Sequence, residues 1–152
     1  MSHAAARLRD PATDAVFVFF DGPDAAGHAT GFGGPEYLAA VTVADRAIAT
    51  FLAVVAERPG FADEDWQIVV TTDHGGEGRT HGGTSAAEST IPFLVVSRHA
   101  AAPRLGDDVR NVDVTPTVLA HFGIDPTATF YAQDGRAAYR LDGVARVPVT
   151  PR

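Results

Sequence analysis

Three short apolar runs divide the first two thirds of the chain. They cover residues 15–20, 67–72 and 91–97, and they are rich in Val, Ile and Phe. Continuous apolar runs of this length are typical of strands that are buried on both faces, and such strands are common in parallel sheets. The pattern therefore predicts three strands.

A long helix is predicted between the first two runs. Pro35 suits its first turn, and Arg58-Pro59-Gly60 marks its end. Between them, apolar residues recur at intervals of three and four, which is the spacing of a helical stripe that faces a core. They are Leu38, Val41, Ala44, Ile48, Leu52 and Val55. The resulting strand–helix–strand order predicts a right-handed βαβ unit.

Shorter helices are predicted near both ends of the chain. Residues 2–10 are rich in alanine, and Pro11 would stop a helix there. In the second helix, Asp113 is a candidate N-cap and Gly123 suits the position after the last turn.

We expect an α/β fold with a mainly parallel sheet flanked by helices, in a single domain over residues 1–152. Residues 73–90 form a long polar loop, and a loop of that length in a compact domain is usually functional or mobile. Residues 125–152 are expected to be a hairpin or a tail, because Asp134-Gly135 is a turn signature.

The charge and the cysteine content of the chain exclude some kinds of partner and of metal site. There are 12 basic and 19 acidic residues, for a net charge of −7, which disfavours nucleic acid and anionic membranes as partners. No cysteine is present, so any metal must bind to histidines and carboxylates. No run of 18 apolar residues indicates a membrane span, and no apolar stretch near Met1 indicates a signal peptide, so the cytoplasm is favoured.

Two pairs of acid and imidazole side chains follow two of the predicted strands. Asp24 and His28 follow the first, Asp73 and His74 follow the second, and His81 lies in the same glycine-rich loop. In a parallel sheet the carboxyl ends of the strands share one edge, so the pairs are expected to converge. A single such residue would more often be a loop residue or a helix cap. Two pairs together predict a site for a divalent cation, with zinc favoured and manganese also compatible.

These segments resemble motifs of the alkaline phosphatase superfamily. Asp24-Ala25-Ala26-Gly27-His28 resembles its Asp-x-x-Gly-His element, and residues 72–82 resemble its Asp-His-Gly…His-Gly element. Residues 111–119 are similar to a Val-Asp-x-x-Pro-Thr helix start of its sulfatase and phosphodiesterase branches. Residues 31–38 resemble the type I phosphodiesterase/nucleotide pyrophosphatase-like branch. The resemblance spans residues 14–124 and implies a partial alkaline-phosphatase-like fold.

The resemblance also implies a mechanism. Members hold two divalent ions side by side, usually zinc, and these ions clamp a phosphoryl group. Asp24, His28 and His81 would hold one ion, while Asp73 and His74 would hold the second in part. A metal-activated Ser or Thr attacks the phosphorus, and water then hydrolyses the phospho-enzyme.

One departure from the family pattern limits this reading. In the family, the nucleophile and a further metal-binding Asp come well before the Asp-x-x-Gly-His element, whereas only 23 residues precede Asp24. The chain therefore resembles the metal-binding C-terminal half of a larger hydrolase of phosphate esters. No catalytic residue is assigned, and the chain alone is expected to be inactive or weakly active.

Other functions stay open. The ligand of the hydrolase would be a small phosphate ester, and the missing half would come from a partner chain or from self-association. A rival reading is a non-catalytic metal-binding or interaction module that pairs with another chain or with itself. A nucleotide-binding module without metal is disfavoured, because no Gly-x-Gly-x-x-Gly turn opens a helix after a strand.

Overall fold

The computed structural model describes residues 2–98, 108–125 and 134–138. The chain divides into two compact units. Unit 1 comprises Met1–Glu64 and His74–Thr90, and unit 2 comprises Asp65–Asp73 and Ile91–Arg152. The chain therefore passes from the first unit to the second and back before it ends in the second. The expectation of one domain stays a prediction.

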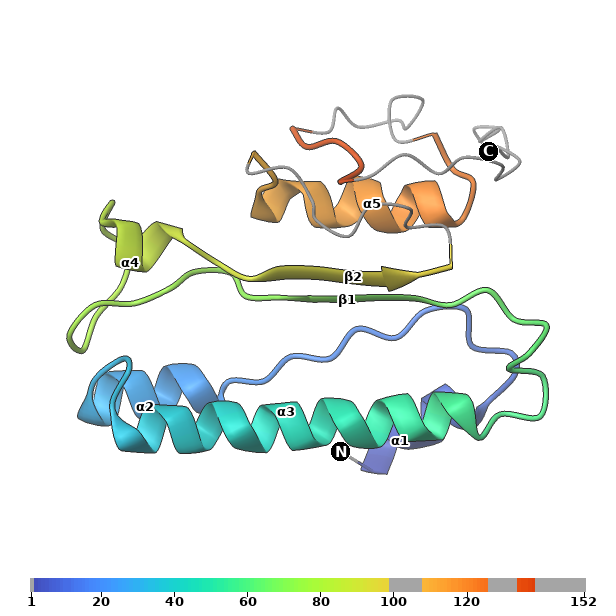
Figure 1. Ribbon diagram of the computed structural model, residues 1–152, viewed down its shortest axis with the longest axis horizontal. Helices are drawn as coiled ribbons and strands as arrows, with labels where there is room; N and C mark the ends of the chain where they lie inside the picture. The colour runs from blue at the N-terminus through green and yellow to red at the C-terminus, as the bar shows by residue number, and fades with distance from the viewer. Residues whose placement is uncertain (1, 99–107, 126–133, 139–152) are drawn as a thin grey trace. The chain divides into compact units, whose positions relative to one another are not determined.

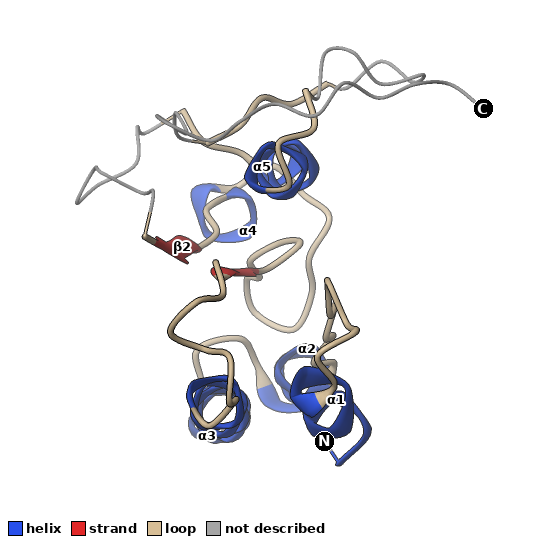
Figure 2. Ribbon diagram, turned by 90° about the vertical axis from the view of Figure 1, so that its right-hand side faces the viewer, coloured by secondary structure: helices blue, strands red, loops and turns tan. Residues whose placement is uncertain are grey.

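Unit 1 is helical. Its helices are α1 (Ser2–Arg9), α2 (Gly22–Thr30), α3 (Pro35–Ala56) and α4 (Ala86–Ser89). Both α1 and α2 pack against α3, as Figures 1 and 2 show. The predicted helices at residues 2–10 and from Pro35 onward are confirmed. Helices α2 and α4 lie where the sequence predicted a turn and a polar loop.

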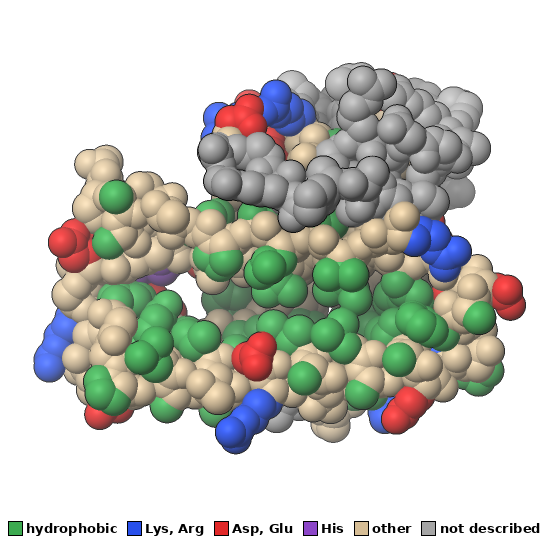
Figure 3. Space-filling view, in the orientation of Figure 1, with side chains coloured by type: hydrophobic (Ala, Val, Ile, Leu, Met, Phe, Trp, Pro, Cys, Tyr) green, Lys and Arg blue, Asp and Glu red, His purple; other side chains and the backbone are tan. Residues whose placement is uncertain are grey.

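Helix α3 forms the centre of unit 1. Ala47, Val54 and Val55 are buried, whereas Leu38, Val41 and Leu52 of the predicted stripe are exposed. Figure 3 shows apolar side chains along this helix, interrupted by acidic and basic ones. The length of α3 and its mean hydropathy of 1.8 would suffice for a membrane span. Helices α1 and α2 pack along it, but most of its apolar window is exposed among the described residues. The absence of a membrane partner stays a prediction.

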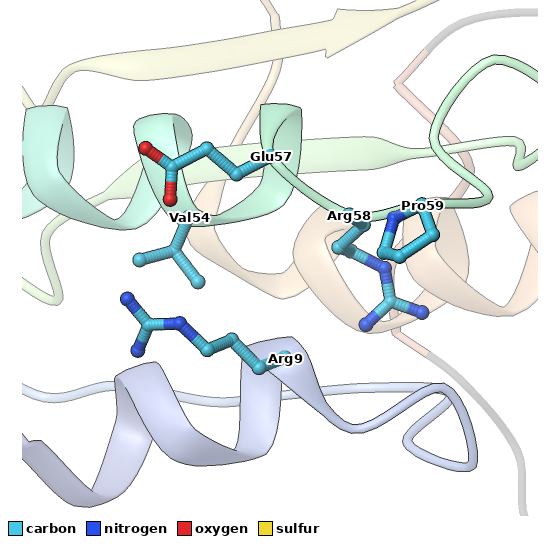
Figure 4. A pocket seen from close by; sticks show the side chains of 5 residues that line it. All are labelled: Arg9, Val54, Glu57, Arg58 and Pro59. Atoms are coloured by element: carbon cyan, nitrogen blue, oxygen red, sulfur yellow. The ribbon is translucent and has the colours of Figure 1, made fainter.

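Arg58 ties α1 to the end of α3. Its guanidinium donates two hydrogen bonds to the carboxylate of Glu64, at 2.6 and 2.7 Å. It also donates to the carbonyl oxygens of Leu8 and Asp10. The hydrogen bond with Glu64 raises the pKa of Arg58 further above its usual range. A cavity of about 260 Å³ beside this junction is lined by Arg9, Val54, Glu57, Arg58 and Pro59 (Figure 4).

The segment of residues 15–20 runs as an extended trace in Figure 1, but it is not paired as a strand in the described part of the chain. Its side chains alternate in exposure, as those of a strand do. Phe17 and Phe19 are 89% and 67% exposed, while the ring of Phe20 stacks on that of Phe51 at a centroid distance of 6.4 Å. The predicted strand at residues 15–20, and with it the predicted βαβ unit, is therefore not formed among the described residues, because a ladder also requires a neighbouring strand.

Unit 2 contains strands β1 (Gln67–Thr71) and β2 (Phe93–Ser97), which confirms two of the predicted strands. The pair is antiparallel, with Gln67 opposite Ser97 and Thr71 opposite Phe93. It is the only sheet among the described residues, so a mainly parallel sheet is not confirmed. Apolar continuity indicates how deeply a strand is buried, but it does not indicate the direction of the neighbouring strand.

Helix α5 (Val114–His121) also belongs to unit 2 and follows a short 3₁₀ turn, η1 (Asn111–Asp113). Asp113 occupies the N-cap position, as predicted, but its side chain does not cap the helix. Its two carboxylate oxygens instead accept hydrogen bonds from the backbone N–H groups of Arg110 and Arg136, both at 2.8 Å. Gly123 has a φ of 71°, which confirms its role after the last turn. The predicted hairpin lies mainly outside the described residues.

Candidate metal centre

Helix α2 carries the first two candidate ligands, Asp24 and His28. Residues four apart on a helix lie on the same face, so the two side chains meet. The distance between Nε2 of His28 and Oδ2 of Asp24 is 3.5 Å. The helix begins with a proline in its first turn and ends before Gly31, whose φ of 115° suits glycine. The local sequence therefore builds this half of the site.

The loop after β1 carries His74 and His81. Two glycines with positive φ, Gly78 at 60° and Gly82 at 95°, allow this loop to fold back on itself. The backbone N–H of Gly75 donates to the carbonyl of Glu88 in α4 at 2.7 Å, which fixes the start of the loop. As a result, the ring of His81 stacks on that of His74, with centroids 3.7 Å apart and planes at 19°.

Two hydrogen bonds join this loop to the end of α2. The backbone N–H of Phe32 donates to the carbonyl of Gly78 at 2.8 Å. Nδ1 of His28 lies 2.9 Å from the carbonyl oxygen of Arg79. They bring Nε2 of His81 to 3.6 Å from Oδ1 of Asp24. One ligand atom from each of Asp24, His74 and His81 lies within 4.8 Å of the others.

Hydrogen bonding assigns the tautomers of two of these histidines. A carbonyl oxygen only accepts, so Nδ1 of His28 must donate to Arg79. By the same reasoning, Nδ1 of His74 donates to the carbonyl of Gly75 at 2.8 Å. In the neutral rings the lone pair is then on Nε2. In His28, Nε2 is also the atom that faces Asp24.

Asp24 supplies the strongest local indication of a cation. Its Oδ1 atom is buried and has no hydrogen-bond partner among the described residues. A buried carboxylate oxygen without a partner is unfavourable, and a cation bound between it and the imidazole nitrogens would remove that cost. Two ligands of a tetrahedral zinc ion, each about 2.1 Å from the metal, lie about 3.4 Å apart. The separation of 3.6 Å between Oδ1 of Asp24 and Nε2 of His81 is close to this spacing, and Nε2 of His28 lies 3.5 Å from the other carboxylate oxygen. The residues present therefore fit a divalent ion.

The described cluster of Asp24, His74 and His81 does not include the carboxylates of Asp21 or Asp73. Asp73 is exposed and belongs to unit 2, where its backbone carbonyl accepts a hydrogen bond from the side chain of Asn111 at 3.4 Å. Its role as a metal ligand stays a prediction. Asp21 occupies the N-cap position of α2 without a side-chain capping bond, and it is exposed.

Two residues that support the site were missed in the sequence. Glu88 accepts hydrogen bonds from the backbone N–H groups of Gly83 and Ser85, at 2.9 and 3.2 Å, and so closes the loop that carries His81. The Ser-x-x-Glu spacing of a capping box was a signal that could have identified it. Phe32 lies between the two halves of the site. It belongs to the segment of residues 31–38 that carries part of the family resemblance, but the sequence assigned it no role.

The sequence of the chain is similar to one known family and to two characterised enzymes. Residues 1–84 match the family described as Type I phosphodiesterase / nucleotide pyrophosphatase. Over 112 residues, 74% of this chain, the sequence is 33% identical to a phosphopentomutase of Edwardsiella ictaluri. Over 124 residues, 78% of this chain, it is 26% identical to a 2,3-bisphosphoglycerate-independent phosphoglycerate mutase of Clostridium tetani.

The matched regions are small parts of those relatives. They cover 25% of the phosphopentomutase and 23% of the phosphoglycerate mutase, so the chain spans about a quarter of the length of each. No solved structure shows a significant match.

Proposed function

Because this chain belongs to the type I phosphodiesterase / nucleotide pyrophosphatase family of the alkaline phosphatase superfamily, we propose that it is the metal-binding part of a phosphoryl-transfer enzyme. The observation that carries the proposal is the convergence of Asp24, His74 and His81, with His28 beside them. The reaction we propose is hydrolysis of a small phosphate ester.

Each of these side chains has a distinct role in the proposed site. Asp24 supplies two carboxylate oxygens, one facing His28 and the other facing His81. The carbonyl of Arg79 holds the ring of His28 so that Nε2 faces the cluster, and the carbonyl of Gly75 orients His74. His81 stacks on His74 and so brings a further nitrogen to the same group.

The donor set of carboxylate and imidazole favours zinc and is compatible with manganese. When bound, such an ion would stabilise negative charge on a phosphoryl oxygen. By resemblance, Asp73 and His74 would contribute to a second ion. No nucleophilic Ser or Thr is assigned among the described residues, so we expect the chain alone to be a weak catalyst at best.

A mutase is a second candidate function. Both relatives are named as mutases rather than as hydrolases. A mutase returns the phosphoryl group to the substrate, whereas a hydrolase gives it to water. The cluster around Asp24 suits either outcome, because it would bind the phosphoryl group rather than choose its acceptor.

The metal content of the purified chain tests the proposal. We expect elemental analysis after zinc loading to give at least one ion per chain, and His81→Ala to lower that content. Asp45→Ala, an exposed carboxylate on α3, is the matched control and should bind metal as the wild type does. A wild-type chain that binds no zinc or manganese above the control level would overturn the proposal.

Activity measurements address the second part of the proposal. Chromogenic phosphate monoesters and diesters, assayed with added zinc, should show little or no turnover by the chain alone. Robust turnover that is abolished by His74→Ala would show that the chain carries its own nucleophile.

We also propose that residues 15–20 form a strand of a larger, mainly parallel sheet. The alternating exposure of this segment supports the proposal, as do the exposed rings of Phe17 and Phe19. An extended apolar segment without a neighbouring strand is a ready site for pairing with another chain. Self-association or a partner chain would supply that pairing.

A further inference from the structure

The ring of Phe32 lies between two glycines that come from the two halves of the metal centre. Gly27 belongs to α2, between Asp24 and His28, and Gly76 follows His74. A Cβ atom at Gly27 would lie 2.5 Å from Cε1 of the Phe32 ring, and one at Gly76 would lie 2.5 Å from its Cδ1. The ring therefore rests against two bare backbones, with its base at Gly76 and its tip at Gly27.

The ring also faces two of the candidate ligands edge to face. Its centroid lies 5.7 Å from that of His28, with planes at 76°, and 6.3 Å from that of His81, with planes at 87°. These are geometries that aromatic pairs prefer. Tyr37, at the start of α3, packs on Phe32 at 5.5 Å. The ring is thus held in place by an element that carries none of the candidate ligands.

The backbone of Phe32 fixes the same relationship. Its N–H group donates to the carbonyl of Gly78, next to Arg79, whose carbonyl orients His28. Main chain and side chain together therefore set the distance between α2 and the loop of residues 74–83.

We propose that Phe32 is a positioning residue that sets the spacing between the Asp24–His28 pair and the His74–His81 pair. The proposal rests on the proposed function for its consequence, which is metal affinity, but its geometric content concerns the chain alone. Residues that orient metal ligands typically affect affinity by about 10–100-fold when they are replaced. Gly27 and Gly76 contribute to the same positioning, because a side chain at either position would displace the ring of Phe32.

A first experiment tests the geometry without metal. In the metal-free chain, NMR should show contacts from the Phe32 ring protons to the Hα protons of Gly27 and Gly76. Phe32→Ala should shift the imidazole signals of His28 and His81 and leave those of His121, in unit 2, unchanged. Phe51→Ala is the matched control. It removes a half-buried ring of unit 1 that stacks on Phe20, and it should leave His28 and His81 unchanged.

A second experiment measures binding of Co²⁺, whose visible absorption reports the number and geometry of its ligands. We expect Phe32→Ala to raise the Kd for Co²⁺ by about 10–100-fold and to change the absorption spectrum. Phe32→Leu keeps much of the side-chain volume, so its Kd for Co²⁺ should lie between those of Phe32→Ala and the wild type. The Kd and the spectrum of Phe51→Ala should match those of the wild type.

A double-mutant cycle then tests the contact itself. Gly27→Ala should weaken Co²⁺ binding in the wild type, because the new methyl group meets the ring. In the Phe32→Ala background the same change should have little further effect, because the ring is gone.

The outcomes separate the two proposals. A wild-type chain that binds no Co²⁺ overturns the proposed function, while the histidine signals still decide the role of Phe32. Unchanged histidine signals in a folded Phe32→Ala chain, or an unchanged Kd and spectrum, overturn the positioning role. If Phe32→Ala unfolds the chain, the histidine signals and the Kd for Co²⁺ of Phe32→Leu test the positioning role instead. Unfolding by both variants would overturn the proposal, because Phe32 would then be a general core residue.

Discussion

Nε2 of His81 lies 3.6 Å from Oδ1 of Asp24, although the two residues come from a glycine-rich loop and from a helix that precedes α3. The oxygen is buried and has no other partner among the described residues. A carboxylate and an imidazole in this relationship either share a proton or bind a common cation. The stacked ring of His74 adds a third ligand atom, which favours the cation.

The first prediction concerns stabilisation by metal. A ligand that binds only the folded state stabilises it by about 2.7 kcal/mol at a concentration 100 times its Kd. We expect zinc to raise the midpoint of thermal unfolding of the wild type, and Asp24→Asn to abolish that increase. Asp45→Asn is the control and should retain it. An equal increase in wild type and Asp24→Asn would show that zinc binds elsewhere.

The second prediction concerns Gly75, which begins the loop of the metal centre. A Cβ atom at this position would collide with the backbone carbonyl of Ala87, and that backbone cannot move easily because Gly75 and Glu88 are hydrogen-bonded. Gly75→Ala should therefore displace His74 and weaken zinc binding by at least about 10-fold, measured by calorimetry. Gly22→Ala is the matched control, since nothing lies within 4 Å of the added atom.

The third prediction concerns the pH dependence of the same loop. Hydrogen bonds from the backbone N–H of Gly83 and from the side chain of Ser85 lower the pKa of Glu88 below its ordinary value of 4.5. A carboxyl group with a lowered pKa stabilises the folded state above its ordinary pKa, and that stabilisation is lost as the pH falls through the lowered value. The loop should therefore be closed at neutral pH and should open on acidification below about pH 4.5.

Hydrogen exchange at the amides of Gly83 and Ser85 measures this opening. Protection of both amides should fall with the protonation of Glu88 in the wild type. In Glu88→Gln the protection should be lower at neutral pH and should change little with pH. A pH profile that is identical in the two proteins would contradict the role of Glu88.

The fourth prediction concerns Thr117 in unit 2. Its buried hydroxyl donates to the carbonyl of Asp113 at 2.6 Å and accepts from the backbone N–H of Ala138 at 2.8 Å. Thr117→Val keeps the shape but leaves the backbone N–H of Ala138 without its partner, which should cost about 1–3 kcal/mol of unfolding free energy in chemical denaturation. Thr115→Val, exposed on the same helix, should change it by less than about 0.5 kcal/mol.

The fifth prediction concerns the extended segment of residues 15–20. Without a neighbouring strand, its amides should exchange rapidly with solvent in dilute solution. If the segment pairs with a second copy, protection should rise with protein concentration, together with the mass measured by sedimentation. Strong protection that is independent of concentration would instead place the pairing strand within one chain.

The sequence determined much of the local structure. Proline and alanine content marked helices α1 and α3, and apolar runs marked β1 and β2. Conformation at this level follows from the preferences of a few neighbouring residues, so it can be predicted without knowledge of the rest of the chain. The motif identified Asp24 and His28 as candidate ligands, but the sequence predicted a turn there, and it is helix α2 that brings these two residues, four apart, onto one face.

Only the tertiary structure decided how these elements meet. The antiparallel pairing of β1 and β2 and the unpaired state of residues 15–20 depend on neighbouring strands, which an apolar run does not specify. The approach of His81 to Asp24 depends on the positive φ angles of two glycines in the loop. It also depends on Phe32, whose ring fits against two further glycines, Gly27 and Gly76. The residue types indicated which side chains could bind a metal. Contacts between segments that are distant in the sequence set the distances that would allow those side chains to bind one ion.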